Sequence, residues 1–245
     1  MKKILLTIGL IAATSAAFAQ GFINFTPSTF LVTTNGTVLS SLFPAGAPNN
    51  NLGAGTVGLT TSQAGGLYYY ALLITPFTGT IPTDLKVWDG AWKYSGLIDT
   101  NHITIAGRVA PGPTGLNAGS LVGWNNTPNG TPGTFPGGTN YMMLVGWSAS
   151  LGTSWLQVSN TLAGAAANAN YFSTLSFFGE SGIGWENPTT AAPGIGIMGS
   201  AANPGGQPIL IASGMTLYEL PIPEPATFAL VGLGGLSLLL FRRRK

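Results

Sequence analysis

The chain contains the segment Tyr141-Met142-Met143-Leu144-Val145-Gly146-Trp147, an almost continuous apolar run. Successive side chains of a β-strand point to opposite faces, so a run without polar alternation is typical of a strand that is covered on both sides. The segment Tyr141–Ala149 is therefore predicted to be a strand of the core. Further strands are predicted at Leu67–Thr75, Ile103–Val109, Phe172–Phe178, Ile209–Ala212 and Met215–Leu220.

The remaining sequence also favours β structure. The residues from Leu31 to Leu39 read LVTTNGTVL, and an Asn-Gly pair between β-branched residues predicts a type I′ hairpin. The chain has 36 glycines, and glycine destabilises helices. The alanine-rich segment Thr161–Asn170 supports a helix and a loop equally. The predicted fold class is all-β, with a single jelly-roll-like β-sandwich as the core.

Two long stretches rich in Gly, Pro, Asn and Thr separate the predicted strands. They are Phe43–Gly66 and Asn125–Asn140. The second is either a linker between two domains or a long loop within one sandwich. The single sandwich is preferred, because each half alone holds few strands. We therefore predict one β domain over residues 20–220, between a signal peptide at 1–19 and a tail at 221–245.

The N-terminus has the three parts of a secretory signal peptide in order. Lys2-Lys3 is followed by the apolar stretch Ile4–Ala13, and then by Ala17-Phe18-Ala19 before Gln20. Small residues at Ala17 and Ala19 suit the pockets of signal peptidase, so cleavage is predicted before Gln20.

Charge and cysteine content exclude several classes of function. The chain has nine Lys and Arg against seven Asp and Glu, but six of the basic residues lie in the terminal segments. The domain keeps three basic and six acidic residues, a formal charge of −3. No basic surface for nucleic acid is expected on such a domain. The absence of cysteine excludes disulfides, thiol catalysis and Cys-ligated metals.

The C-terminal tail begins with the polar motif Ile222-Pro223-Glu224-Pro225-Ala226-Thr227. Proline fixes φ and lacks an N–H group, so Pro-Glu-Pro is expected to stay extended, as a processing enzyme requires. Glu224 adds one charge for recognition.

An apolar segment and a basic cluster follow this motif. A transmembrane helix over 226–241 would span about 24 Å, less than the roughly 30 Å of a bilayer core. Such a helix suits transient retention better than permanent anchorage. The positive-inside rule places the terminal cluster in the cytoplasm and the domain outside. This cluster consists of Arg242, Arg243, Arg244 and Lys245.

In these features the tail resembles the PEP-CTERM sorting signal. Pro223, Glu224 and Pro225 match its motif, while Ile222 replaces the usual valine. The resemblance implies recognition by a membrane enzyme of the exosortase type, removal of the tail, and delivery to the cell envelope or exopolysaccharide layer. It covers about a tenth of the chain and implies nothing about the fold of the domain.

Catalytic residue types are scarce in the domain, and no enzyme activity, cofactor or metal is predicted. His102 is the single histidine, and no Gly-x-Ser-x-Gly motif accompanies it. A glycosidase pair drawn from four carboxylates is the more distant alternative. These carboxylates are Asp84, Asp89, Glu180 and Glu186.

Aromatic residues support a carbohydrate-binding alternative. Tyr69 lies in a Tyr-Tyr-Tyr run whose side chains must alternate between faces, and Trp88 and Trp92 lie among acidic and basic residues. Exposed rings beside polar groups stack on sugars, but the favoured interpretation is that these rings fill the ends of the sandwich. The leading hypothesis is an exported structural or adhesive protein of the envelope or biofilm matrix. Its expected partners are signal peptidase, an exosortase, transiently the inner membrane, and exopolysaccharide.

Overall fold

The computed structural model describes residues 21–24, 31–43, 57–60, 67–83, 86–101, 106, 119–121, 139–168, 172–186, 195–196 and 214–222. Several predictions fall outside these ranges. They concern the signal cleavage site at Ala17, Ala19 and Gln20, the strands Ile103–Val109 and Ile209–Ala212, and the tail from Pro223 onward.

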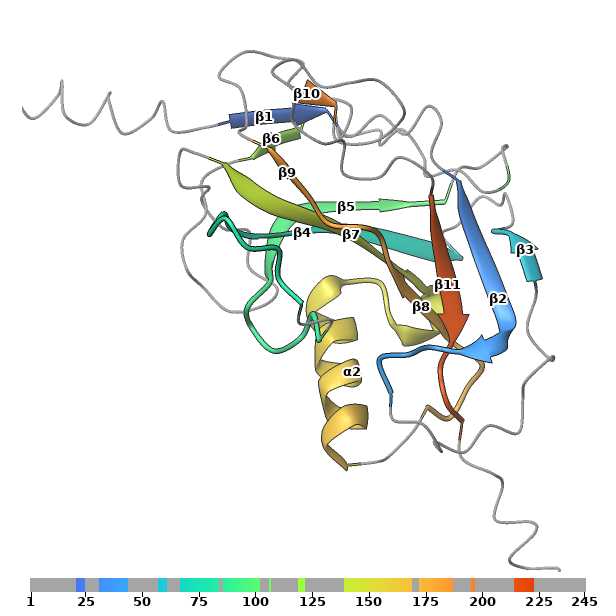
Figure 1. Cartoon of the computed structure of the whole chain (residues 1–245). Coiled ribbons are helices and arrows are strands. Elements are labelled where there is room, and N and C mark those ends of the chain that lie inside the picture. Colours follow the sequence, from blue (N-terminus) through green and yellow to red (C-terminus); the bar gives the residue numbers. More distant parts are fainter. Residues whose placement is uncertain are drawn as a thin grey trace, which may run out of the picture.

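Most of the described strands build one large mixed sheet, and the described part of the protein is predominantly β (Figure 1). Strands β2 and β11 run parallel, and the other neighbours run antiparallel. A further strand, β9 (Gly184–Glu186), pairs with β7. From edge to edge the order is β3 (Val57–Leu59), β2 (Val32–Leu39), β11 (Met215–Glu219), β8 (Phe177–Glu180), β7 (Asn140–Ser148), β4 (Tyr68–Pro76) and β5 (Lys93–Thr100).

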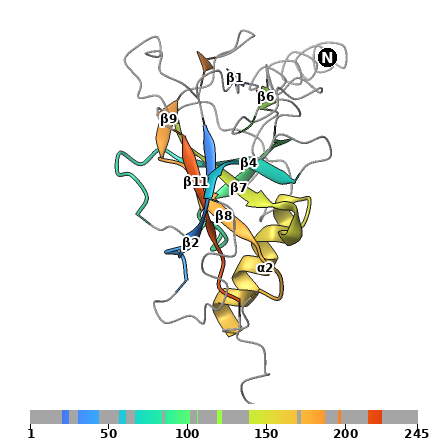
Figure 2. The ribbon, with the colours of Figure 1, turned by 90° about the vertical axis from the view of Figure 1, so that its right-hand side faces the viewer.

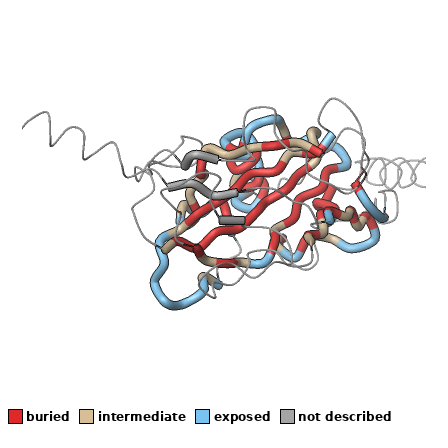
Figure 3. Tube along the Cα trace, turned by 90° about the horizontal axis from the view of Figure 1, so that it is seen from above, coloured by how far each residue is buried: buried red, intermediate tan, exposed pale blue. Residues whose placement is uncertain are grey.

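The apolar segment at Tyr141 forms the centre of this sheet, as its sequence predicts. Strand β7 pairs along its whole length with β4, from Tyr68 opposite Ser148 to Pro76 opposite Asn140. Every residue of β7 except Ser148 is buried (Figure 3). The strands predicted at Leu67–Thr75 and Met215–Leu220 are also confirmed. The one predicted at Phe172–Phe178 is confirmed only from Phe177.

Each face of the sheet carries its own buried cluster, because side chains alternate along the strands. On the helix face, aromatic rings of the sheet pack against the only α-helix among the described residues, α2. On the opposite face the cluster is mainly aliphatic and comes from the strands themselves. It contains Val32, Tyr68, Tyr70, Leu72, Ile74, Met142, Leu144, Phe177, Met215 and Leu217.

Helix α2 (Trp155–Asn168) confirms the helical alternative for the alanine-rich segment, and it begins earlier than that segment. Its buried apolar residues recur at helical spacing and belong to one cluster with residues of the sheet. Figure 2 shows the helix beside the sheet. The backbone N–H of Gln157 donates to Oγ of Ser154 at 3.3 Å, which caps the first turn. A short 3₁₀ helix, η2 (Ala149–Leu151), connects β7 to this start. The buried residues of α2 are Trp155, Val158, Leu162 and Ala165.

A second, smaller sheet lies above the large one (Figures 1 and 2). Its order is β10 (Ile195–Gly196), β1 (Gly21–Asn24) and β6 (Gly119–Leu121). The sheets and the single helix support the all-β class, while the jelly-roll-like sandwich stays a prediction. In the described part of the chain, no helix has the length and apolar character needed to cross a membrane. The helix predicted over 226–241 lies outside that part.

The hairpin predicted at Asn35-Gly36 is wrong. Both residues lie inside β2, which continues to Leu39. The register with β11 moves from Asn35 opposite Tyr218 to Leu39 opposite Glu219, so the intervening residues bulge out of the sheet. Oδ1 of Asn35 accepts hydrogen bonds from the backbone N–H and the hydroxyl of Thr37, at 2.9 and 2.7 Å. The Asn-Gly pair therefore bends the chain locally without reversing it.

Candidate functional site

The last described residues form a junction between the sheet and the C-terminal tail. We call Glu219, Leu220, Pro221 and Ile222 the junction. Its backbone is bound to two other segments of the domain. The carbonyl of Glu219 accepts from the N–H of Ser40 at 2.8 Å, the N–H of Leu220 donates to the carbonyl of Ser176 at 2.9 Å, and the carbonyl of Pro221 accepts from the N–H of Phe172 at 3.0 Å.

The side chains of the junction are buried as well. Leu220 is fully buried within the cluster of the helix face, which also contains Phe43 and Phe172. The rings of Phe43 and Phe172 meet edge to face with centroids 5.5 Å apart. Ile222 is 8% exposed. The domain therefore holds its C-terminal segment up to the residue that precedes Pro223.

This arrangement defines a β-sheet domain whose last strand runs directly into a C-terminal sorting segment. Residues 221–245 match the family model of the PEP-CTERM protein-sorting motif, so the chain is a protein with a PEP-CTERM sorting domain. The motif implies processing by an exosortase-type enzyme, with export and membrane anchoring before sorting to the cell surface. No curated protein and no solved structure matches the chain.

The match begins at Pro221, so the sorting segment and the folded domain share two residues. The predicted motif residues Pro223, Glu224 and Pro225 follow directly and lie outside the described residues. The same holds for the basic cluster of Arg242, Arg243, Arg244 and Lys245.

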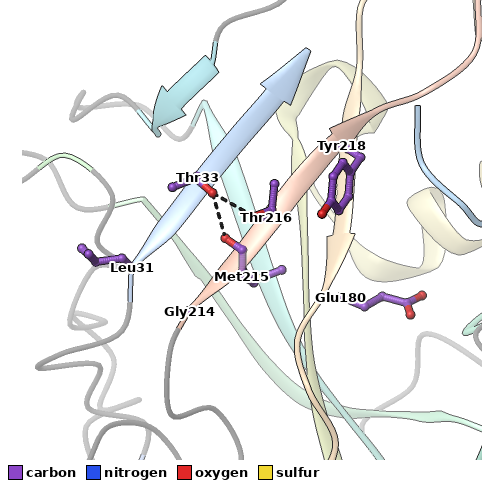
Figure 4. A pocket seen from close by; sticks show the side chains of 7 residues that line it. All are labelled: Leu31, Thr33, Glu180, Gly214, Met215, Thr216 and Tyr218. Carbon is purple, nitrogen blue, oxygen red and sulfur yellow. Dashed lines mark hydrogen bonds between the residues drawn. The ribbon is translucent and has the colours of Figure 1, made fainter. Parts of the chain in front are cut away.

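A groove lies over β11, where α2 does not cover the sheet (Figure 4). Thr216 and Tyr218 alternate with residues of the opposite cluster and so lie on the helix face. The hydroxyls of Thr33 and Thr216 are 3.0 Å apart, and Tyr218 is 37% exposed. The groove has a volume of about 420 Å³ and is lined by Leu31, Thr33, Glu180, Gly214, Met215, Thr216 and Tyr218.

A second hollow of about 210 Å³ shares Glu180 and Tyr218 with this groove. It is lined with small polar residues, which are Ser40, Ser41 and Ser181. Together the two hollows surround Tyr218 with hydroxyl groups and one carboxyl group. An aromatic ring among such groups provides both stacking and hydrogen bonding to a polar ligand.

Two of the three rings considered for glycan stacking are buried. Trp88 is 8% exposed and Trp92 only 1%, and both belong to the cluster of the helix face. The ring of Trp88 packs against Phe43 with centroids 6.0 Å apart. Tyr69 is half-buried and stacks on Trp147 at 6.1 Å. Trp88 and Trp92 therefore lie in the core, in agreement with the favoured interpretation that these rings fill the interior, and not on the surface as the stacking alternative requires.

Three buried carboxyl groups lie at the border of the opposite face. Burial raises the pKa of Glu186 to about 8 and also raises the pKa of Glu219. Burial likewise raises the pKa of Asp99 to about 6, although the N–H of Thr100 donates to its carboxylate at 2.7 Å and opposes the shift. Among the described residues, neither carboxyl oxygen of Glu186 or Glu219 has a hydrogen-bond partner. Burial therefore favours the protonated form of these three carboxyl groups relative to carboxyl groups in water.

The carboxylates considered for a glycosidase pair are not brought together. Glu180 is opposite Val145 of the helix face, whereas Glu186 is opposite Asn140, whose side chain alternates to the other face. Asp89 is exposed in a turn closed by its N–H donating to the carbonyl of Lys86 at 2.9 Å. Asp84 and His102 lie outside the described residues. Within the described part of the chain, no three His, Asp or Glu residues cluster as metal ligands would.

The groove at Tyr218 was missed at the level of sequence, although a signal was present. The strand Met215-Thr216-Leu217-Tyr218-Glu219 alternates between apolar residues and residues with hydroxyl groups. Such alternation predicts one exposed polar face. The partner residues Thr33 and Glu180 are distant in sequence, so only the sheet order reveals the groove.

Proposed function

We propose that this protein is an exported component of the cell envelope or exopolysaccharide matrix, with a structural or adhesive role, sorted through its C-terminal segment. The observation that carries the proposal is the PEP-CTERM motif at 221–245, placed directly after a folded β domain. In this scheme signal peptidase cleaves before Gln20, and the segment 226–241 retains the precursor in the inner membrane. The exosortase then releases the domain outside the cytoplasm.

The composition of the domain supports an extracellular role. Only 7% of all residues in the chain are charged, and the chain is rich in hydroxyl and amide side chains. The basic residues that raise the isoelectric point of the precursor lie mostly in the two terminal segments. The mature domain would carry a small negative charge, without a basic surface that binds nucleic acid.

The test follows the C-terminus of the protein in a bacterium that encodes an exosortase. The full chain is expressed in this host and in a strain that lacks the exosortase gene, and the intact mass is measured in envelope and extracellular fractions. We expect loss of Arg242–Lys245 and surface delivery only where the enzyme is present. A matched variant, Glu224→Gln, should slow this loss because it removes the charge of the motif. An intact C-terminus in both strains would overturn the proposal.

A second candidate function is carbohydrate binding through the groove at Tyr218. The exposed ring of Tyr218 beside the paired hydroxyls of Thr33 and Thr216 favours a polar ligand with an apolar face, such as a neutral sugar. Binding of the purified protein to the host's exopolysaccharide should weaken by about tenfold in Tyr218→Ala, as expected for one lost stacking contact. The control is Leu175→Ala, since Leu175 is equally exposed at 37% and lies outside the groove. Equal binding by both variants would remove the groove from the proposal.

A glycosidase-like activity stays the more distant alternative. It predicts release of reducing sugar from the same polysaccharide. Glu180 and Glu186 face opposite sides of the sheet and cannot form one catalytic pair, so each is substituted to Gln alone and in combination. An activity that survives the double substitution would need other residues.

A further inference from the structure

The junction lies where the folded domain and the sorting segment overlap. The first two residues of the sorting segment, Pro221 and Ile222, are part of the folded domain. The carbonyl of Pro221 is bound to Phe172, and the side chain of Ile222 is 8% exposed. There is thus no spacer between the last buried residue and Pro223.

The distance from the domain to the apolar segment is short. Five residues, 223–227, separate Ile222 from the start of the apolar run at Phe228. A fully extended chain spans at most 3.3–3.6 Å per residue, so this connection reaches about 20 Å. An enzyme that binds the motif therefore works within about 20 Å of the domain.

An enzyme that cleaves or transfers a peptide needs access to its backbone. Extended peptides are commonly bound through their own N–H and carbonyl groups, with alternate side chains placed in pockets. At the junction three of these backbone groups already bind the domain, and the side chains of Leu220 and Ile222 are buried. Residues before Pro223 become available to an enzyme only when the junction separates from Ser40, Phe172 and Ser176.

We propose that the junction limits tail processing, with Leu220 and Ile222 as positioning residues that hold the N-terminal side of the Pro-Glu-Pro motif against the domain. The enzyme engages the motif after local opening of the junction, so the rate of processing follows the population of the open state. This inference rests on the proposed exosortase processing and adds that the folded domain controls its rate.

The experiment lengthens the connection without changing the domain. Six Gly and Ser residues followed by a second Ile are inserted between Ile222 and Pro223 in the full chain, so that the Ile-Pro-Glu-Pro motif stays intact. Tail loss is followed by pulse–chase and intact mass in the exosortase-containing host. The inserted residues supply free backbone before the motif. Processing should accelerate about fivefold or more, the factor that one net hydrogen bond contributes.

The control carries the same insertion far from the junction. The turn at Gly79 and Thr80, between β4 and β5, accepts additional residues because both residues are exposed and a Cβ at Gly79 would meet no atom within 4 Å. This variant should be processed at the wild-type rate. Equal rates for both insertions and the wild-type chain would overturn the inference.

A second variant opens the junction from within. Leu220→Ala removes a buried side chain of the junction that lies outside the matched motif and should accelerate processing. Because the truncation also lowers the melting temperature of the domain, processing is assayed below the melting transition. Hydrogen exchange of the Leu220 amide, which donates to Ser176, reports opening directly and should quicken in step with processing. A faster amide without faster processing would contradict the proposed role of these residues.

The two proposals fail in different ways. If the wild-type chain keeps its tail in the exosortase-containing host, the proposed function fails, and the role of the junction fails with it. If the wild-type chain loses its tail normally but neither Leu220→Ala nor the junction insertion changes the rate, only the role of the junction is overturned.

Discussion

Both faces of the large sheet carry a buried cluster, but the two clusters differ in chemistry. The helix face packs large aromatic rings against α2, with contacts such as Trp147 to Trp155 at 5.8 Å. The opposite face is mainly aliphatic and is bordered by carboxyl groups whose pKa burial raises. The stability of the helix face therefore depends mainly on the volume of its side chains. The stability of the opposite face depends in addition on the protonation of the carboxyl groups at its border.

The largest expected effect is on the helix face. Trp155 is 1% exposed, and its ring lies between Trp147 and Phe178. Trp155→Ala should lower the free energy of unfolding by about 3–5 kcal/mol, because the cavity cannot be refilled. Denaturant titration measures the loss. The neighbouring Leu156→Ala is the control: Leu156 is 45% exposed and should change stability by less than about 0.5 kcal/mol.

The second effect depends on pH and belongs to the opposite face. Burial raises the pKa of Glu186 from 4.5 to about 8. The folded state therefore holds this proton more tightly than the unfolded state, and stability falls as the pH rises through this window. The pKa of Asp99 is raised to about 6, so Asp99 adds to the loss of stability in the lower part of this pH window.

Glu186→Gln should abolish the decrease in the free energy of unfolding between about pH 6 and 8. It should also stabilise the domain at pH 8 by about 1–3 kcal/mol. Thermal unfolding across this pH range provides the measurement. The matched control is Asp89→Asn at an exposed carboxylate, which should change the free energy of unfolding at pH 8 by less than about 0.5 kcal/mol. A wild-type profile that rises between pH 6 and 8 would contradict the assignment.

The third effect tests how closely the strands approach on the opposite face. A Cβ at Gly146 would lie 2.8 Å from Cδ1 of Tyr70 and 3.0 Å from Cδ2 of Leu217. Gly146→Ala should therefore destabilise the domain by about 1–3 kcal/mol through overpacking.

The same substitution at Gly164 on α2 should have the opposite sign. A Cβ there meets no atom within 4 Å, and alanine in a helix is favoured over glycine by roughly 0.5–1 kcal/mol. If both substitutions shift the melting temperature in the same direction, the predicted difference between Gly146 and Gly164 is wrong.

Sequence reasoning succeeded where a pattern is local and strong. The continuous apolar character of β7 predicts burial on both faces, and the family motif of the tail is explicit in Pro223, Glu224 and Pro225. It failed at Asn35-Gly36, because the partner of β2 is the distant strand β11 and no hairpin is needed. At Trp88 and Trp92 it favoured the interior but kept a glycan-stacking alternative, since charged neighbours in sequence do not reveal that the rings turn inward.

The groove and the junction lay beyond prediction for the same reason. Both depend on which strands become neighbours, and the sheet places Thr33 beside Thr216 and Ser40 beside Glu219. Such long-range pairings leave little trace in a single sequence. The signal peptide, the jelly-roll-like sandwich and the membrane helix stay predictions.

The parallel pairing of β2 with β11 has a consequence for the timing of export. These neighbours come from opposite ends of the domain, and a chain that crosses a membrane from its N-terminus presents β2 long before β11. The large sheet cannot be completed until Met215–Glu219 has emerged, only a few residues ahead of the Pro-Glu-Pro motif. Folding of the domain and arrival of its sorting signal at the membrane are therefore nearly simultaneous events. A chain stalled earlier in translocation would expose an unpaired β2 edge outside the cytoplasm.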